Sequence, residues 1–231
     1  MIKLSLNEED YLKTIYQISV KQGRSEVSTN EIAKRISLSA ASVSDMLKKL
    51  AQKELIHYVK YQGVSLTQEG KNIAIDLVRK HRLWETFLVE KLGFSWDEVH
   101  EIAEQLEHIQ SDKLIERLDE FLGFPAFDPH GDAIPNSRGE LIERRKKNLS
   151  QIPENQIVKV VAVEENSATF LKHLNKIDIQ IGTVIKVLEK ADYDKSVEIE
   201  MQTTGKRQNI SKEIAENLYV VQYVTQKEHE N

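Results

Sequence analysis

The sequence predicts a mainly α-helical protein that ends in a small β domain. Apolar residues recur at helical spacing through about residues 5–52 and 73–124. From about residue 156 to residue 225, runs of β-branched residues replace this pattern. A Pro/Gly-rich segment, FPAFDPHGDAIP, and a charged connector at 139–155 separate the two parts. A chain of 231 residues organised in this way is long enough for two or three small domains.

The N-terminal part is typical of three short helices followed by a hairpin. Ser5 or Asn7 can cap the first helix, which continues through YLKTIYQISV, and Ser28 or Thr29 can cap the second, TNEIAKRI. A tight turn at 37–39 leads into a third helix, AASVSDMLKKLAQKE. The residues of this helix that we expect to face inward are Val43, Leu47 and Leu50. Two β-type runs, LIHYVKY and VSLT, then lie on either side of a hairpin turn expected at residues 62–63.

The remaining elements are a helical middle and a β-rich end. Residues 73–124 are almost wholly helical in pattern, and Gly93 and Gly123 stand where helix C-terminal caps belong. The four expected strands are QIVKVVAV, GTVIKVLEK, SVEIEMQTT and NLYVVQYV. We expect residues 206–211 to lie between strands and the whole segment to form a small β-barrel or sandwich.

The composition limits the chemistry that is possible. The chain has no cysteine, which excludes disulfides, thiolate zinc sites and thiol catalysis and fits a reducing cytoplasm. No apolar run is long enough to span a bilayer, and the N-terminus lacks a signal-like apolar region, so we expect a cytoplasmic protein with no membrane partner. Residues 1–72 carry 11 Lys and Arg against 8 Asp and Glu, whereas the whole chain has a net charge of −5. This modestly basic N-terminal part permits nucleic-acid binding without establishing it.

The order helix, three-residue turn, helix, hairpin is that of a winged helix-turn-helix. Small residues open the third helix, and they would allow its N-terminus to approach base edges or phosphates closely. Nearby lysines could contact phosphates, and Asp45 could accept a hydrogen bond from a cytosine amino group. The alternative is an ordinary three-helix bundle whose serines serve only as caps. The candidate DNA contacts are Thr29, Ser39, Ala41, Ser42, Ser44, Asp45, Lys48, Lys49 and Lys60.

Residues 98–108, EVHEIAEQLEH, present good metal ligands on one face of a predicted helix. His100, Glu104, Glu107 and His108 fall within an arc of roughly 100°. Apolar residues occupy the other side, so a merely solvated polar face is the alternative. A rise of ~1.5 Å per residue separates His100 from His108 by ~12 Å, too far for one ion. A metal-binding face here would therefore contribute to two sites.

The first of these sites would use the C-terminal end of the segment. Glu107 and His108 lie three and four residues after Glu104, so the three side chains can converge. Asp10, in EEDYLKTIY, is the natural fourth ligand, since it would tie the metal to the N-terminal helix. The alternative for Asp10 is a first-turn acid favoured by the helix dipole.

The second site would combine His100 with the preceding helix. His81 and Glu85, in HRLWE, are four residues apart and project from one side of that helix. The alternative is an ordinary surface pair. Asp128 and His130, in DPHG, are more typical of a structured turn than of metal ligands.

These segments, together with VSLTQEGK and FPAFDPHGDAIP, resemble the DtxR/MntR family of metal-dependent transcriptional repressors over essentially the whole chain. The resemblance implies a homodimer and three parts: a winged helix-turn-helix at 1–72, a helical metal-binding and dimerisation domain at 73–140, and an SH3-like, FeoA-type β-barrel at 156–231, with a linker at 141–155. It implies two ions per subunit. The residues that match the primary site are Asp10, Glu104, Glu107 and His108. Those that match the ancillary site are His81, Glu85 and His100.

Two positions distinguish metals within that family. Iron-sensing members typically have cysteine where this chain has Glu104 and methionine where it has Asp10, whereas manganese-sensing members have carboxylates. Hard oxygen ligands suit Mn²⁺, with Fe²⁺ as the alternative. Some short manganese sensors carry a second acid at the position of Lys13, and its absence favours two separated ions. In longer relatives the C-terminal domain adds an ancillary ligand, for which Glu164 and Glu165 are the nearest match.

The predicted function is a metal-dependent DNA-binding regulator, a Mn²⁺-activated repressor of metal-uptake genes. A Fe²⁺-activated repressor of the same family, a metal-indifferent regulator and a helical di-metal carboxylate enzyme are the alternatives. The enzyme is disfavoured because such sites use Glu-x-x-His pairs on two helices, and the one such pair here, Glu54 and His57, lies outside the ligand-rich zone. We expect the dimer face to include Trp84, Leu88 and Trp96, for which ordinary core packing is the alternative.

Overall fold

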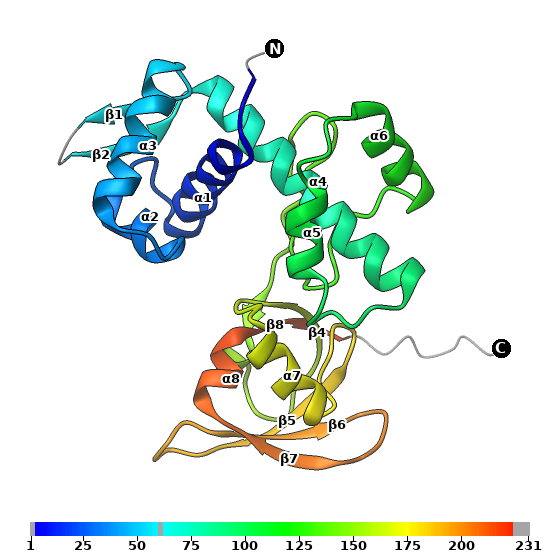
Figure 1. Cartoon of the computed structure of the whole chain (residues 1–231). Helices are drawn as coiled ribbons and strands as arrows, with labels where there is room; N and C mark the ends of the chain where they lie inside the picture. The colour runs from blue at the N-terminus through cyan, green and yellow to red at the C-terminus, as the bar shows by residue number, and fades with distance from the viewer. Residues whose placement is uncertain (1–2, 60–61, 224–231) are drawn as a thin grey trace. The chain divides into compact units, whose positions relative to one another are not determined.

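The structure is a computed structural model that describes residues 3–59 and 62–223 (Figure 1). The chain forms two compact units. The first comprises Met1–Trp84, Glu101–Ala126 and Ile134–Leu141, and the second comprises Glu85–His100, Phe127–Ala133 and Ile142–Asn231. Lys60, an expected phosphate contact, lies outside the described residues.

The first unit begins with three capped helices, α1 (Leu6–Gln22), α2 (Thr29–Arg35) and α3 (Ala40–Gln52). Ser5, Ser28 and Ser39 are their N-caps, and each serine hydroxyl accepts a hydrogen bond from a backbone N–H of the first turn. The first two caps are reciprocal capping boxes completed by Glu8 and Glu31. The predicted helix starts at Ser5 and Ser28 are thereby confirmed.

The capping box of α2 gives a testable pH dependence. Hydrogen bonds from the Ser28 hydroxyl and backbone N–H, and then from Gln22, lower the pKa of Glu31 from 4.5 to about 2. A lowered carboxyl pKa stabilises the fold above pH 4.5, and this contribution is lost as the pH falls through about 2. We expect Glu31→Gln to reduce the unfolding free energy at neutral pH, with the difference from wild type shrinking in acid. Urea denaturation between pH 2 and pH 7 measures the difference in unfolding free energy, and Glu26→Gln, at an exposed position, is the control. A difference that does not change with pH would contradict the role of Glu31 in the capping box.

A short antiparallel hairpin completes the helix-turn-helix region. Strands β1 (Ile56–Val59) and β2 (Gly63–Leu66) pair with Val59 opposite Gly63. The sequence predicted a turn at residues 62–63, but Gly63 belongs to β2. Val27 forms an isolated bridge with Val64, which joins the loop before α2 to the hairpin. The side chains fully buried beneath these elements include Leu12, Ile15, Ile32, Val43, Leu47 and Leu50.

Three further helices follow: α4 (Gln68–Leu92), α5 (His100–Leu106) and α6 (Asp112–Phe121). Gly93 and Gly123 have φ values of 73° and 76° just beyond α4 and α6, which confirms their positions as C-terminal caps. The predicted helix over 98–108 is shorter than expected. It ends at Leu106 because the chain tightens into a turn, in which the N–H of Ile109 donates to the Leu106 carbonyl. No helix in the described residues is long and apolar enough to cross a membrane.

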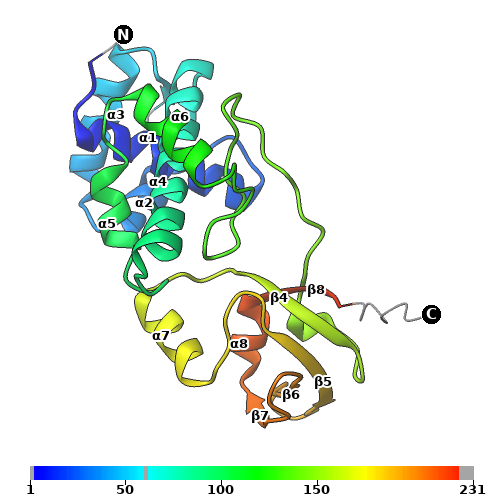
Figure 2. The same cartoon turned by 90° about the vertical axis from the view of Figure 1, so that its right-hand side faces the viewer.

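The second unit is built on one antiparallel sheet in the order β3-β8-β4-β5-β6-β7 (Figure 2). Its strands are β3 (Lys147–Asn148), β4 (Ile157–Val163), β5 (Val184–Lys190), β6 (Val197–Met201), β7 (Arg207–Ile210) and β8 (Leu218–Gln222). Over the described residues, β3 and β7 stay at opposite ends of the sheet, so it is open rather than a closed barrel. Apolar side chains from β4, β5, β6 and β8 form the core.

Several elements of this unit differ from the prediction. The segment 206–211, expected between strands, supplies β7, which pairs with β6 although Ile210 is its one buried residue. A helix, α7 (Ala168–Lys176), begins at the N-cap Ser167 and buries Leu171 and Leu174. A short helix, α8 (Lys212–Asn217), and a 3₁₀ turn (Leu149–Gln151) were also missed. These elements are short, and their placement depends on the sheet rather than on local pattern.

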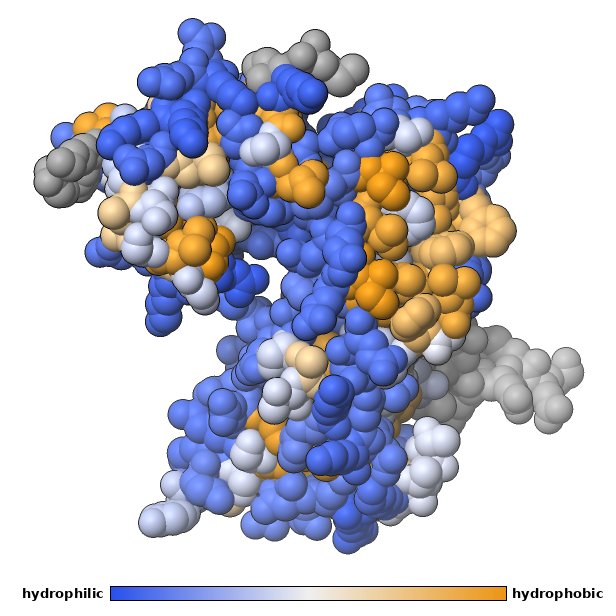
Figure 3. All heavy atoms as spheres, viewed as in Figure 1, coloured by the Kyte–Doolittle hydropathy of each residue, from blue (hydrophilic) through white to orange (hydrophobic). Residues whose placement is uncertain are grey.

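The aromatic residues expected at a dimer face are buried within the single chain. Trp84, Leu88 and Trp96 are each at most 9% exposed, so the core-packing alternative is correct. The first unit exposes other apolar side chains on and just after α6, and Figure 3 shows an apolar patch over α5 and α6. The most exposed members are Leu114 at 40%, Phe121 at 63% and Phe124 at 69%.

Candidate metal centre

Three of the four predicted primary ligands come together in the first unit. Asp10 on α1, and Glu107 and His108 in the turn after α5, each offer a ligand atom, and these atoms lie within 4.8 Å of one another. His108 Nε2 is 3.1 Å from Asp10 Oδ1. Glu107 is fully buried. One helix and one turn, about 100 residues apart in the chain, therefore converge on a nitrogen and oxygen donor set.

Glu9 orients the histidine of this cluster. Its Oε2 lies 2.7 Å from His108 Nδ1, and its Oε1 accepts a hydrogen bond of 2.9 Å from the Gln110 amide. Because the Glu9 carboxylate occupies Nδ1, Nε2 on the Asp10 side is the ring nitrogen that could bind a metal. A carboxylate behind a ligating histidine fixes ring orientation in metal sites generally. Glu9 could not be singled out from the sequence, because three consecutive acids at a helix start are also typical of a favourable interaction with the helix dipole.

Glu104 reaches this cluster through a lysine. Lys13 Nζ is 2.9 Å from Glu104 Oε1 and 2.6 Å from Glu107 Oε2. The Lys13 side chain is 5% exposed and that of Glu104 is 46% exposed. His81, expected in the ancillary site, belongs to the same first unit, and its Nδ1 is 2.6 Å from Glu107 Oε2. Glu107 is thus shared between a lysine and a histidine.

The electrostatics and the unsatisfied atoms of the cluster favour a cation. Burial raises the pKa of Asp10; the charges of Glu107 and Glu104 add to this, and His108 and Lys13 oppose it. Glu107 Oε1 is buried and has no hydrogen-bond partner among the described residues. A buried carboxylate oxygen without a partner is costly, and a bound cation would satisfy it. The donor set therefore fits a divalent metal held by oxygen and nitrogen.

The ancillary residues are divided by the boundary between the units. Glu85 and His100 both belong to the second unit, and His100 Nδ1 is 3.4 Å from Glu85 Oε1. His81 lies one helical turn before Glu85 on α4 but belongs to the first unit. The grouping of all three at one ion stays a prediction.

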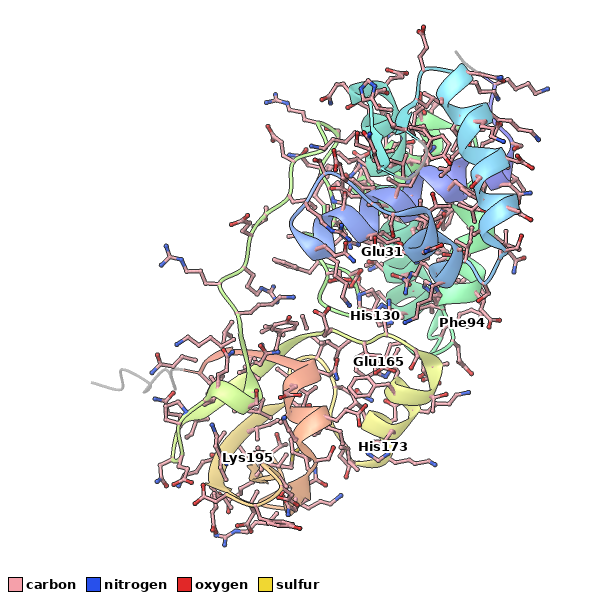
Figure 4. All side chains as sticks on the ribbon, turned by 90° about the vertical axis from the view of Figure 1, so that its left-hand side faces the viewer. Glu31, Phe94, His130, Glu165, His173 and Lys195 are labelled. Carbon is pink, nitrogen blue, oxygen red and sulfur yellow. The ribbon has the colours of Figure 1, made fainter. Side chains whose placement is uncertain are left out.

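A second buried cluster, which lies in the second unit, surrounds Glu85. His130, labelled in Figure 4, places Nδ1 3.6 Å from Glu85 Oε2 and Nε2 2.8 Å from the Trp96 carbonyl oxygen. Asp128 Oδ1 accepts hydrogen bonds from the backbone N–H groups of His130 and Asp132, which is the structured turn that was predicted. Burial alone would lower the pKa of His130, but Glu85, Asp128 and the Trp96 carbonyl together raise it from 6.5 to about 9. His130 thus pairs with Glu85 on one side of the ring and with the Trp96 carbonyl on the other, so it supports the position of Glu85.

The two acids expected to add an ancillary ligand lie just after β4. Glu164 accepts a hydrogen bond of 3.0 Å from the Tyr219 hydroxyl. Glu165, also labelled in Figure 4, accepts one of 2.6 Å from Ser167. Both are exposed, and a role for either at the metal stays a prediction.

The candidate DNA contacts form an exposed row on α3. Ala41, Ser42, Asp45, Lys48 and Lys49 are exposed on the helix whose opposite side is buried. Ser39 and Ser42 hydroxyls are 2.9 Å apart, Ser44 donates to the Ala40 carbonyl, and Thr29 starts α2. Lys48 Nζ lies 2.9 Å from Asp45 Oδ1 and lowers the pKa of that carboxyl. Asp45 therefore serves at least to anchor Lys48.

Known protein families match each part of the chain. The N-terminal DNA-binding domain of iron-dependent repressors matches residues 3–64, their metal-binding and dimerisation domain matches residues 67–136, and the FeoA domain matches residues 147–222. An uncharacterised helix-turn-helix-type regulator of Methanocaldococcus jannaschii is 36% identical over 119 residues, which are 52% of this chain and 94% of that protein. The chain belongs to the iron-dependent repressor family. This is a family of metal-dependent transcriptional repressors, as the sequence predicted.

Two similar proteins are named for different metals. The iron-dependent repressor IdeR of Mycobacterium tuberculosis is 35% identical over 127 residues, which are 55% of this chain and 54% of that protein. The solved structure of a manganese-dependent transcriptional repressor in complex with manganese is 34% identical, with a TM-score of 0.80. That match covers 94% of this chain and all of the other.

Proposed function

We propose that this protein is a Mn²⁺-activated repressor of metal-uptake genes that binds operator DNA as a homodimer. The observation that carries the proposal is the convergence of Asp10, Glu107 and His108, with the buried Glu107 Oε1 unpartnered among the described residues. These residues join α1 of the DNA-binding region to the turn after α5, so a shared ligand would couple the two. Mn²⁺ would supply two positive charges and open coordination positions for oxygen and nitrogen ligands.

The chain's own residues account for the coupling. Asp10 lies on α1, and the buried side chains of α1 belong to the same hydrophobic core as those of α3. Glu9 holds His108 in the ligating orientation. When Asp10 is held to Glu107 and His108, α1 is fixed to the metal-binding region and the helix-turn-helix loses freedom. Differential affinity of the metal for this arrangement is what allostery requires.

The proposed primary ligands are Asp10, Glu104, Glu107 and His108. We infer that Glu104 joins after its contact with Lys13 changes, since its exposed side chain can move. The proposed ancillary ligands are His81, Glu85 and His100, with Glu164 or Glu165 as a further donor, which gives two ions per subunit. We also propose that the three domains and the linker between the second and third of them meet at residues 72, 140 and 155.

The homodimer would use the apolar side chains exposed on and after α6, namely Leu114, Phe121 and Phe124. They lie in the segment matched by the metal-binding and dimerisation domain. Two α3 helices of a dimer would then read major grooves about 34 Å apart. We place this DNA-binding regulator in the cytoplasm. The proposal assigns it no catalytic role.

The metal preference can be tested by exchanging the two residues that distinguish iron sensors from manganese sensors. We expect Asp10→Met combined with Glu104→Cys to weaken the Mn²⁺ response and to strengthen the anaerobic Fe²⁺ response, because thioether and thiolate ligands favour the softer ion. Fluorescence anisotropy of a labelled fragment upstream of a metal-uptake gene, at fixed salt, measures both responses. A double variant that keeps the wild-type preference would count against Mn²⁺ selection by these two carboxylates and would leave Fe²⁺ as the alternative.

A further inference from the structure

Lys13 is a lysine buried within the metal centre, and its ammonium carries the same sign of charge as a metal ion. It lies on α1, three residues after Asp10, and it is 4% exposed. Its ammonium group donates to two carboxylate oxygens, Glu104 Oε1 at 2.9 Å and Glu107 Oε2 at 2.6 Å. The ammonium is therefore held between two carboxylates.

The proposed function assigns both of these carboxylates to the metal. A buried ammonium is costly unless acceptors compensate it, and buried carboxylates are costly unless a cation does. Lys13 and the pair of glutamates meet both needs at once when no metal is present. A carboxylate that shares its negative charge with an ammonium at one oxygen attracts a divalent ion less strongly at the other oxygen.

We propose that Lys13 is the resident cation of the centre, and that a metal has to compete with its ammonium for the negative charge of Glu104 and Glu107. Lys13 thereby sets the metal concentration at which the switch responds. This inference rests on the proposed function, and it adds a residue that competes with the ligand instead of binding it.

The lysine also explains how α1 is held before metal arrives. In the metal-free protein, Lys13 ties α1 to the α5 segment through one positive charge shared by two carboxylates. Metal binding would replace this tie with one that also includes Asp10 and His108.

The test removes the charge and keeps a polar side chain that is one atom shorter. In Lys13→Gln the competing ammonium is gone, so we expect the Kd for Mn²⁺, measured by isothermal titration calorimetry on the full chain, to fall at least tenfold. In chelator the same variant should melt at a lower temperature than wild type, because the two glutamates then face each other without a cation. Lys21→Gln, an exposed lysine on the same helix, is the matched control and should change neither quantity.

A second variant keeps the inference testable if Lys13→Gln does not fold in chelator. Lys13→Arg retains a positive charge that cannot be removed, so its Kd for Mn²⁺ should equal or exceed that of wild type. A tighter Kd in Lys13→Arg would overturn the inference, as would an unchanged or weaker Kd in a folded Lys13→Gln. If wild type binds Mn²⁺ and Glu104→Ala does not, these results leave the proposed function standing. If wild type binds no metal at all, both the function and the inference fail.

Discussion

Glu104→Ala is expected to abolish metal-stimulated DNA binding while leaving the fold intact. Loss of an outer-shell group at a metal site typically costs 10–100-fold in affinity, so loss of a ligand should weaken Mn²⁺ binding by about 100-fold or more. The fold should survive because the Glu104 side chain is 46% exposed and Lys13 keeps its contact with Glu107. Anisotropy titrations with and without Mn²⁺ measure the effect, and far-UV circular dichroism checks the fold.

Glu101→Ala is the matched control for that experiment. Glu101 is an exposed glutamate in the first turn of the same helix, α5. Its removal changes the net charge equally but should leave the metal response unchanged. A Glu104→Ala protein that still responds to Mn²⁺ like wild type would remove Glu104 from the metal centre.

Gly131→Ala is expected to destabilise the second unit by about 3 kcal/mol or more. Gly131 has φ +86°, where a side chain costs about 1–2 kcal/mol. In addition, a Cβ there would stand 2.0 Å from the Val161 carbonyl oxygen, and such overpacking typically adds about 1–3 kcal/mol. The shift needed to relieve this contact would also disturb His130, whose carbonyl accepts a hydrogen bond from the N–H of Val163.

Gly205→Ala separates the two causes in the same unit. Gly205 also has a positive φ, +69°, but nothing lies within 4 Å of its added Cβ, so its cost should be limited to about 1–2 kcal/mol. Urea denaturation followed by tryptophan fluorescence compares the two variants with wild type. Equal losses in both would show that the close approach to Val161 does not constrain the turn.

Local pattern predicted the helices of the first unit well, because their signals are local. Ser5 and Ser28 caps and the buried face of α3 all follow from residues within a few positions of one another. Strand β7 could not be predicted in this way. Its Arg-Gln-Asn sequence becomes a strand because β6 is there to pair with it.

The metal centre shows the same difference between local signals and contacts with distant residues. Ligand types and spacing indicated Asp10, Glu107 and His108 directly, and the structure brings these three together. The roles of Glu9 and Lys13 could not be predicted, since they depend on contacts across about 90 to 100 residues of chain. In the sequence Lys13 marks only the absence of a second acid, whereas in the structure its ammonium contacts Glu104 and Glu107 within the centre.

The central claim is that metal binding at Asp10, Glu107 and His108 controls DNA binding. The most direct test is the anisotropy of a labelled upstream DNA fragment with the full chain, first in chelator and then with Mn²⁺ added at fixed salt. We predict that Mn²⁺ raises the DNA affinity of the wild-type protein at least tenfold and that anaerobic Fe²⁺ does so less effectively. Equal DNA affinity in chelator and in saturating Mn²⁺ would contradict the account and leave a winged-helix protein that ignores metal.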